Sequence, residues 1–164
     1  MKDKFVPDGF IIPGCLEAEK FRLRILTVED VEKDYEAVMS SREYLRSILD
    51  PMDDDTWPEE DMTVEVCLRD LKRHQDDFVN RRAFTYTVVS LDETICLGCV
   101  YINPSEAEEY DAEVYLWARQ SELANGLEDY LYQMVKTWIK EWPFERVAFP
   151  GRDINWTDWR SKLG

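Results

Sequence analysis

Residues 111–141 read DAEVYLWARQSELANGLEDYLYQMVKTWIKE, a stretch whose apolar positions follow two different periods. In its first part the apolar residues Val114, Leu116 and Ala118 alternate with Glu113, Tyr115 and Trp117. Alternation with a period of two predicts a strand whose two faces differ. In its last part apolar residues recur at three- and four-residue steps, namely Leu127, Leu131, Met134, Val135 and Trp138. This second period predicts a helix with one buried face.

A polar turn, residues 119–126, joins this strand to this helix. Such a turn directs the first N–H groups of the helix, and the positive end of its dipole, beyond the strand, which favours an anion site. A structural interpretation stays open beside it. Asn125 is a good N-cap and Glu128 follows three residues later, so the helix can cap itself. The acidic residues Glu122, Glu128 and Asp129 would then repel a phosphate.

The whole chain predicts one α+β domain at residues 21–164, preceded by an N-terminal arm at residues 1–20. The predicted order is β-α-α-β-β-β-α-β-α. Strands are predicted at 21–27, 83–90, 94–103, 111–119 and 146–149, and helices at 28–49, 61–82, 127–141 and 153–164. The first helix is expected to be interrupted or bent near Ser40 and Ser41.

This order resembles the GNAT superfamily of acyl-CoA N-acyltransferases. The resemblance also rests on AEVYLWAR at 112–119, on Gly98 inside the third strand, and on DINWTDWRSKLG at 153–164. It implies a GNAT-like fold, a mixed and mainly antiparallel central sheet flanked by helices. It covers the chain from Phe21 onward.

The phosphate-binding turn of that family carries the pattern Arg/Gln-x-x-Gly-x-Gly/Ala. Placed on this sequence, the pattern puts Leu123 at the Arg/Gln position, Gly126 at the first Gly and Glu128 at the second small residue. Only the glycine agrees. The departure leaves open whether the chain binds the cofactor in the usual way.

The resemblance implies acetyl-CoA as cofactor, with its pantetheine arm beside the fourth strand. The positions implied for cofactor binding are Trp117, Ala118, Arg119, Ala124, Asn125, Gly126, Leu127, Asn155 and Arg160. Arg160 stands where many members have a tyrosine that acts as general acid. Because arginine stays protonated, it can instead stabilise a thiolate or hold a phosphate.

Acetyl transfer to an amine needs a neutral amine, so a base has to take up a proton. The resemblance implies a carboxylate of the central strand in this role, and Glu113 is the residue at that place. Beside Tyr115 and Trp117, burial would raise its pKa toward that of a general base. The alternative is an ordinary strand glutamate, salt-bridged or solvated.

The chain is strongly acidic, with a formal net charge of −15 and a pI near 4.4. This charge excludes nucleic acid as a partner and attracts cationic small molecules or basic peptides. Carboxylates are dense at residues 50–61, where Asp53, Asp54 and Asp55 precede Trp57. The corresponding segment of the family borders the acceptor, so these residues are candidates for binding an ammonium by charge and cation–π contact. The alternative is a solvated loop whose Trp57 packs down.

Other features limit the function further. The first residues lack the apolar run of a signal peptide or membrane span, so we expect a cytoplasmic protein with no membrane partner. The four cysteines are expected to be buried thiols, and the single histidine, His74, to lie at the solvent edge of a helix with no metal. Monomer and homodimer both stay open.

Two hypotheses of function remain. The first is a GNAT-type N-acetyltransferase that acts on a primary amine of a cationic small molecule or peptide. The second is a non-catalytic GNAT-fold binding or regulatory protein that has lost conventional CoA binding. The turn from Leu123 to Glu128 is the sequence feature that separates them.

Overall fold

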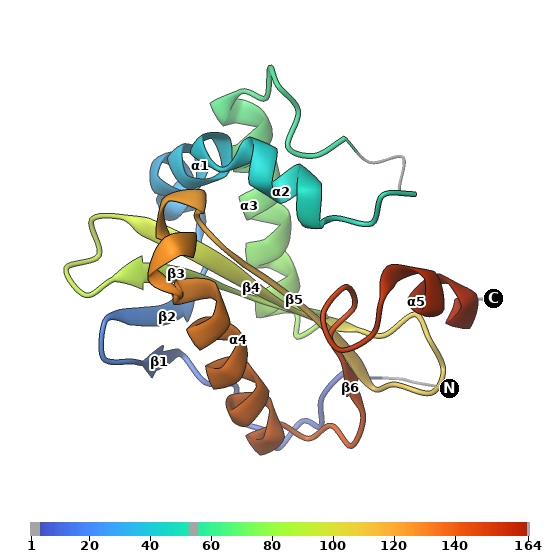
Figure 1. The fold of residues 1–164 in the computed structure, drawn as a ribbon. Helices are drawn as coiled ribbons and strands as arrows, with labels where there is room; N and C mark the ends of the chain where they lie inside the picture. Colours follow the sequence, from blue (N-terminus) through green and yellow to red (C-terminus); the bar gives the residue numbers. More distant parts are fainter. Residues whose placement is uncertain (1–3, 53–55, 164) are drawn as a thin grey trace.

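One six-stranded sheet forms the centre of the computed structural model, which describes residues 4–52 and 56–163 (Figure 1). The strands are β1 (Cys15–Glu17), β2 (Phe21–Ile25), β3 (Phe84–Ser90), β4 (Cys96–Pro104), β5 (Ala112–Ala118) and β6 (Val147–Ala148). They lie side by side in chain order. Every neighbouring pair is antiparallel except β5 and β6, which are parallel. The predicted α+β class with a mainly antiparallel sheet is confirmed.

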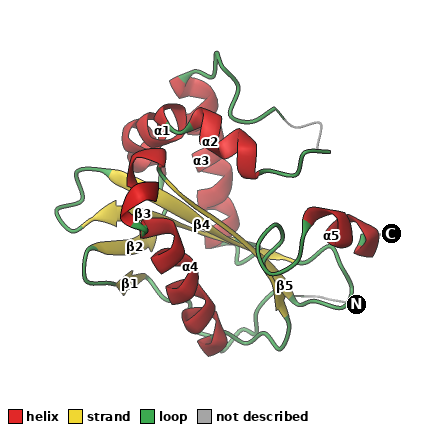
Figure 2. Ribbon diagram, in the orientation of Figure 1, coloured by secondary structure: helices red, strands yellow, loops and turns green. Residues whose placement is uncertain are grey.

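Helices cover both faces of this sheet (Figure 2). The α-helices are α1 (Val31–Ser40), α2 (Arg42–Ile48), α3 (Val64–Val79), α4 (Leu127–Trp138) and α5 (Trp156–Lys162), and short 3-10 helices are η1 (Val28–Asp30), η2 (Gln120–Asn125) and η3 (Ile139–Glu141). Helices α1, α2 and α3 lie on one face, and α4 lies on the other. No helix in the described ranges is long and apolar enough to span a bilayer.

The alternation along β5 assigns its side chains to these two faces. Val114 and Leu116 pack in the cluster that contains α4, whereas Trp117 packs in the cluster that contains α1, α2 and α3. The helical stripe of α4 meets the first set through Leu131 and Val135. The two periods read from the sequence therefore describe the real faces of the strand and the helix.

The helix predicted at 28–49 is broken at Ser41, which separates α1 from α2. Ser41 is fully buried, and its Oγ accepts a hydrogen bond of 2.8 Å from the backbone N–H of Gln120. The break thus fixes the start of the turn that follows β5. The next helix begins at Val64 rather than at residue 61, because Thr63 caps it by accepting from the N–H of Val66 at 3.3 Å.

The described part of the N-terminal arm packs against the domain. Val6 is 2% exposed, and Phe5 stacks on Phe84 and Phe144 with ring centroids 5.7 and 4.9 Å apart. Strand β1, which was not predicted, pairs with β2. The division into an arm and a domain at residue 20 stays a prediction.

Strands β4 and β5 approach closely at Gly98. A Cβ atom there would lie 2.1 Å from the carbonyl oxygen of Trp117, a distance that no side chain tolerates. Gly98 therefore permits the pairing that holds Trp117 on the face of the sheet covered by α1, α2 and α3.

Candidate active site

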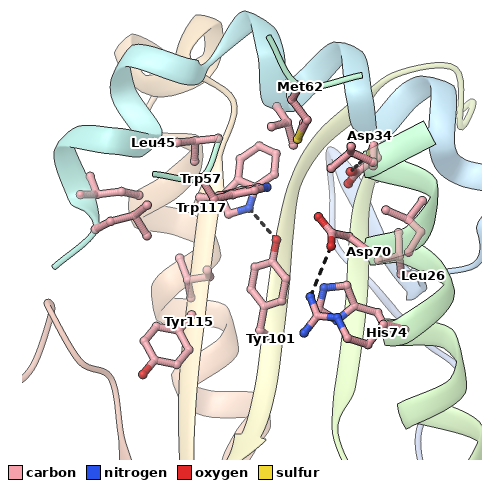
Figure 3. Close-up of a pocket in the computed structure, with 18 of the residues that line it drawn as sticks. Leu26, Asp34, Leu45, Trp57, Met62, Asp70, His74, Tyr101, Tyr115 and Trp117 are labelled. Atoms are coloured by element: carbon pink, nitrogen blue, oxygen red, sulfur yellow. Dashed lines mark hydrogen bonds and ion pairs between the residues drawn. The ribbon is translucent and has the colours of Figure 1, made fainter. Parts of the chain in front are cut away.

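A pocket of about 470 Å³ lies between the sheet and helices α1, α2 and α3 (Figure 3). Strands β4 and β5, the three helices, and the loop that carries Trp57 form its walls. Asp34 and Cys67 lie at one end. Tyr115 and Arg152 lie at the other, beside the edge of β5. The pocket therefore extends from the interior of the layer formed by α1, α2 and α3 to the outer edge of β5.

Aromatic rings line the middle of this pocket. The indole Nε1 of Trp117 donates a hydrogen bond of 3.1 Å to the hydroxyl of Tyr101, as Figure 3 shows. Trp57 is partly buried against the same cluster, and the ring of His74 lies 5.6 Å from that of Tyr101. Aromatic ring faces in a partly enclosed pocket can contact a cation.

The prediction that His74 lies at the solvent edge is wrong, because His74 lines the pocket. Its Nδ1 is 3.2 Å from the hydroxyl of Thr85. Burial, with a smaller contribution from the positive charge of Arg73, lowers the pKa of His74 to about 4. The ring is therefore neutral at pH 7 and does not repel a cation.

Asp34 is the buried carboxylate of the pocket, with 6% of its surface exposed. Its Oδ2 accepts a hydrogen bond of 3.3 Å from the thiol of Cys67, a weak donor. Its Oδ1 has no hydrogen-bond partner in residues 4–52 and 56–163. Burial is the main cause that raises the pKa of Asp34 to about 6; the hydrogen bond from Cys67 opposes it, and the negative charges of Asp30 and Asp70 add to it. At neutral pH the pocket thus contains a poorly compensated negative charge.

Glu113, the predicted base, is 5% exposed but does not line the pocket. It accepts hydrogen bonds from the hydroxyl of Tyr115 and, at 3.1 Å, from the backbone N–H of Glu106. Burial raises its pKa above the ordinary value. Because Tyr115 does line the pocket, Glu113 is connected with it through that hydroxyl.

The outer edge of β5 is open beyond its short pairing with β6. The pairing covers only Ala112 and Glu113. Further along, the carbonyl of Leu116 accepts a hydrogen bond of 2.9 Å from Arg152, and the N–H of Ala118 donates one of 3.0 Å to Glu128. The two side chains lie 3.6 Å apart as an ion pair. The hydroxyl of Tyr44 also donates to Glu128. We call Arg152, Glu128 and Tyr44 the edge cluster.

The turn after β5 differs from the predicted self-capped helix start. Residues 120–125 form η2, and Gly126 precedes α4 with a left-handed φ of 75°. Asn125 does not cap α4: the N-cap residue is Gly126, and the Asn125 amide donates to Glu122 at 2.9 Å. Glu128 does not complete a capping box, because it bonds the N–H of Ala118 instead. The capping prediction is therefore wrong, and Glu128 acts on the strand edge.

Several predicted cofactor residues have partners within the chain. Arg119 binds Glu36 through two hydrogen bonds of 2.9 and 2.7 Å. Asn155 caps α5 by accepting from the N–H of Asp158 at 2.8 Å. Arg160 pairs with Asp50. Of the remaining positions, Trp117 lines the pocket, Ala118 belongs to the open edge, and Ala124, Asn125, Gly126 and Leu127 belong to the turn. Their roles toward a cofactor stay predictions.

The acidic loop is described only in part. Asp53, Asp54 and Asp55 lie outside the described residues. Trp57 lines the pocket, as an acceptor-binding residue would. The sequence reasoning did not find Asp34, Arg152 and Tyr44, whose importance depends on contacts with distant parts of the chain.

The thiols offer no metal site. Cys67, Cys96 and Cys99 are buried as predicted, whereas Cys15 is exposed. No group of three or more His, Cys, Asp or Glu side chains in the described ranges is arranged to hold a metal ion.

The sequence resemblance implies acetyl-CoA as cofactor, and the hydrogen-bonding groups of the open β5 edge can be compared with those that its pantetheine arm needs. A pantetheine arm would use the carbonyl of Leu116 and the N–H of Ala118, which point away from the paired side of β5. These groups fit such an arm, provided that Arg152 and Glu128 release them. The turn offers less, because the N–H groups of Glu122 and Gly126 already bond carbonyls within it. Arg152 supplies a basic side chain at this edge.

No family model and no curated protein sequence matches the chain, but solved structures do. The ribosomal-protein-alanine acetyltransferase from Vibrio fischeri is 16% identical, with a TM-score of 0.60 over 92% of this chain and 81% of that protein. RimL, an alpha-N-protein acetyltransferase of a ribosomal protein, is 19% identical, with a TM-score of 0.58 over 83% and 70%. The microcin immunity acetyltransferase MccE, solved with acetyl-CoA and AMP, is 14% identical, with a TM-score of 0.59 over 76% and 63%.

Against some of these proteins the chain spans less than two thirds of the other chain's length, for example 60% of an acetyltransferase from Vibrio cholerae. At such identities the likeness concerns the fold. The chain has the fold of the GNAT acetyltransferases, and the fold prediction is confirmed.

Proposed function

We propose that this GNAT-fold chain is an N-acetyltransferase that uses acetyl-CoA and acetylates a primary amine of a cationic small molecule or peptide. One observation carries the proposal: the pocket with the buried carboxylate Asp34 reaches Tyr115 and Arg152, which lie at the open edge of β5. A cationic acceptor and a cofactor arm can therefore meet at Tyr115. The solved structures of RimL with coenzyme A and of MccE with acetyl-CoA support the choice of cofactor.

Acetyl-CoA, when bound, supplies an acetyl thioester. The chain's own groups at the edge are the Leu116 carbonyl and the Ala118 N–H, which would orient the cofactor arm after Arg152 and Glu128 release them. Arg152 would then be available to a phosphate, which a guanidinium binds well.

The acceptor amine has to lose a proton, and Tyr115 with Glu113 provides a route for it. Tyr115 lines the pocket, and its hydroxyl donates its hydrogen to the Glu113 carboxylate. A proton taken from the amine by the Tyr115 oxygen would move the tyrosine proton to Glu113. The raised pKa of Glu113 suits it to hold that proton.

Titration of the purified chain with acetyl-CoA tests this proposal. Binding should stabilise the fold by about 2.7 kcal/mol at one hundred times the dissociation constant. Addition of an amine should then yield an acetylated amine by mass spectrometry, and Glu113→Gln should slow this transfer without weakening acetyl-CoA binding. No thermal shift at millimolar acetyl-CoA would overturn the proposal.

A second function has an observation of its own. Because Arg152 and Glu128 already satisfy the strand edge, the chain could be a GNAT-fold binding protein without a cofactor. The same titration separates the two, since such a protein would bind an amine in the pocket and leave acetyl-CoA free.

A further inference from the structure

Asp34 is a buried carboxylate that no described Lys or Arg side chain neutralises. This carboxylate is almost fully buried, and its hydrogen-bond partner in the described part of the chain is the Cys67 thiol. None of the described Lys or Arg side chains forms an ion pair with it. A buried carboxylate without such a partner is costly unless a ligand completes it. Oδ1 has no partner among the described residues and is not one of their fully enclosed unsatisfied atoms, so it is the oxygen that a ligand in the pocket would bind.

The other charged groups of the pocket leave room for a positive ligand at Asp34. Arg73 is 3.6 Å from Asp70, so its charge is engaged. Arg152 lies at the opposite end, against the β5 edge. His74 is neutral, and Glu59 adds a further negative charge to the lining. An ammonium beside Asp34 therefore meets carboxylates and aromatic rings.

An acceptor that fills the pocket has to contact both of its ends, at Tyr115 and at Asp34. The amine that reacts has to reach Tyr115, where the proton route begins. Asp34 lies at the other end, and Trp117 and Tyr101 lie between the two in Figure 3. An amine with a single charge can occupy one end only. A chain with a charge at each end, and an apolar middle against the rings, uses the whole pocket.

We propose that the acceptor is a linear diamine, with one ammonium group held by Asp34 while its other amine reacts beside Tyr115. The ring faces of Trp57 and Trp117 contact the methylene chain or the held ammonium. This inference rests on the proposed function for the fate of the second amine. The binding of the first ammonium is independent of it.

The test uses 1,4-diaminobutane, 1,5-diaminopentane and 1,6-diaminohexane, each compared by calorimetry with the monoamine of equal carbon number. Titrations use the whole chain without cofactor at pH 8, where Asp34 is ionised. At least one diamine should bind ten times or more tighter than its monoamine. Asp34→Asn should remove this preference. Glu59→Gln, which changes another carboxylate of the pocket, is the matched control and should keep most of it.

The outcomes separate this inference from the proposed function. A diamine preference that depends on Asp34, without acetyl-CoA binding, would leave the inference standing and overturn the enzyme. Acetyl transfer to monoamines or to peptides without a diamine preference would overturn the inference alone. Absence of diamine binding, or a preference that survives in folded Asp34→Asn, would also overturn it. Thermal unfolding of each variant shows that it is folded.

Discussion

Two polar regions at opposite ends of the pocket differ in whether their polar groups have hydrogen-bond partners within the chain. At the β5 edge, side chains of the protein satisfy both backbone groups, through Arg152 on Leu116 and Glu128 on Ala118. At Asp34 one carboxylate oxygen has no hydrogen-bond partner among the residues that the structure describes. A satisfied group stabilises the fold and has to be released before a ligand binds. An unsatisfied group destabilises the fold, and a ligand that completes it recovers this free energy.

The largest expected effect is that of replacing Asp34 on the free energy of unfolding. The folded pKa of about 6 lies above the value of 3.8 for an exposed aspartate. The folded state therefore binds the proton more tightly, and the free energy of unfolding falls as pH rises from about 4 to about 6. Asp34→Asn should raise the free energy of unfolding on the order of 2–3 kcal/mol at pH 8 and change it little near pH 4. Urea unfolding at the two pH values measures this.

Asp30 supplies the matched control for that experiment. It is also buried, at 4% exposure, but it pairs with Arg24 at 2.7 Å and accepts from the N–H of Thr27 at 2.9 Å. Asp30→Asn should therefore lower stability at pH 8, by about 1–3 kcal/mol. If both variants shift stability in the same direction, the contrast between a compensated and an uncompensated carboxylate is wrong.

The sequence predicts the fold better than it predicts these two regions. The alternation in residues 112–118 and the helical stripe from Leu127 onward are local signals, and they describe the real β5 and α4. Strand β1 was missed because three residues are too few to show a period, and the strand exists through its pairing with β2. A strong local period in the sequence predicts its element correctly, whereas a strand as short as β1 can be identified only from its pairing with another strand.

Asp34 and the edge cluster could not be predicted for a related reason. In the sequence Asp34 is one more acidic residue of a polar helix, and it is buried only where α3 supplies Cys67. Tyr44 and Glu128, which bond each other, are 84 positions apart. Glu128 was correctly singled out as unusual at the turn. Its actual partner, the N–H of Ala118, depends on the approach of α4 to β5, which no local pattern contains.

A smaller effect is expected from opening the β5 edge. Glu128→Ala removes the acceptor that engages the N–H of Ala118 and releases Arg152 from its ion pair. Acetyl-CoA should then bind about ten times more tightly, which corresponds to about 1.4 kcal/mol. Calorimetric titration with acetyl-CoA measures the change.

Glu122→Ala is the control for this prediction. Glu122 is also an acidic residue of the region, but its carboxylate bonds Asn125 and not the strand. If both variants gain the same affinity for acetyl-CoA, the gain comes from removing negative charge near the phosphates and not from releasing the β5 edge. Unchanged affinity in Glu128→Ala would mean that the cofactor does not use this edge.

The smallest expected effect belongs to Tyr44, the third member of the edge cluster. Tyr44→Phe removes the hydroxyl that holds Glu128, so the edge should open more easily and acetyl-CoA should bind two to five times more tightly, about 0.5–1 kcal/mol. Tyr35→Phe is its match, since the Tyr35 hydroxyl donates to the Met62 carbonyl at 2.7 Å, away from the edge. It should lower the melting temperature similarly and leave the affinity unchanged. In a Glu128→Ala background, Tyr44→Phe should add nothing, because the group it acts on is gone. Additive gains would show that Tyr44 acts on the cofactor by another route.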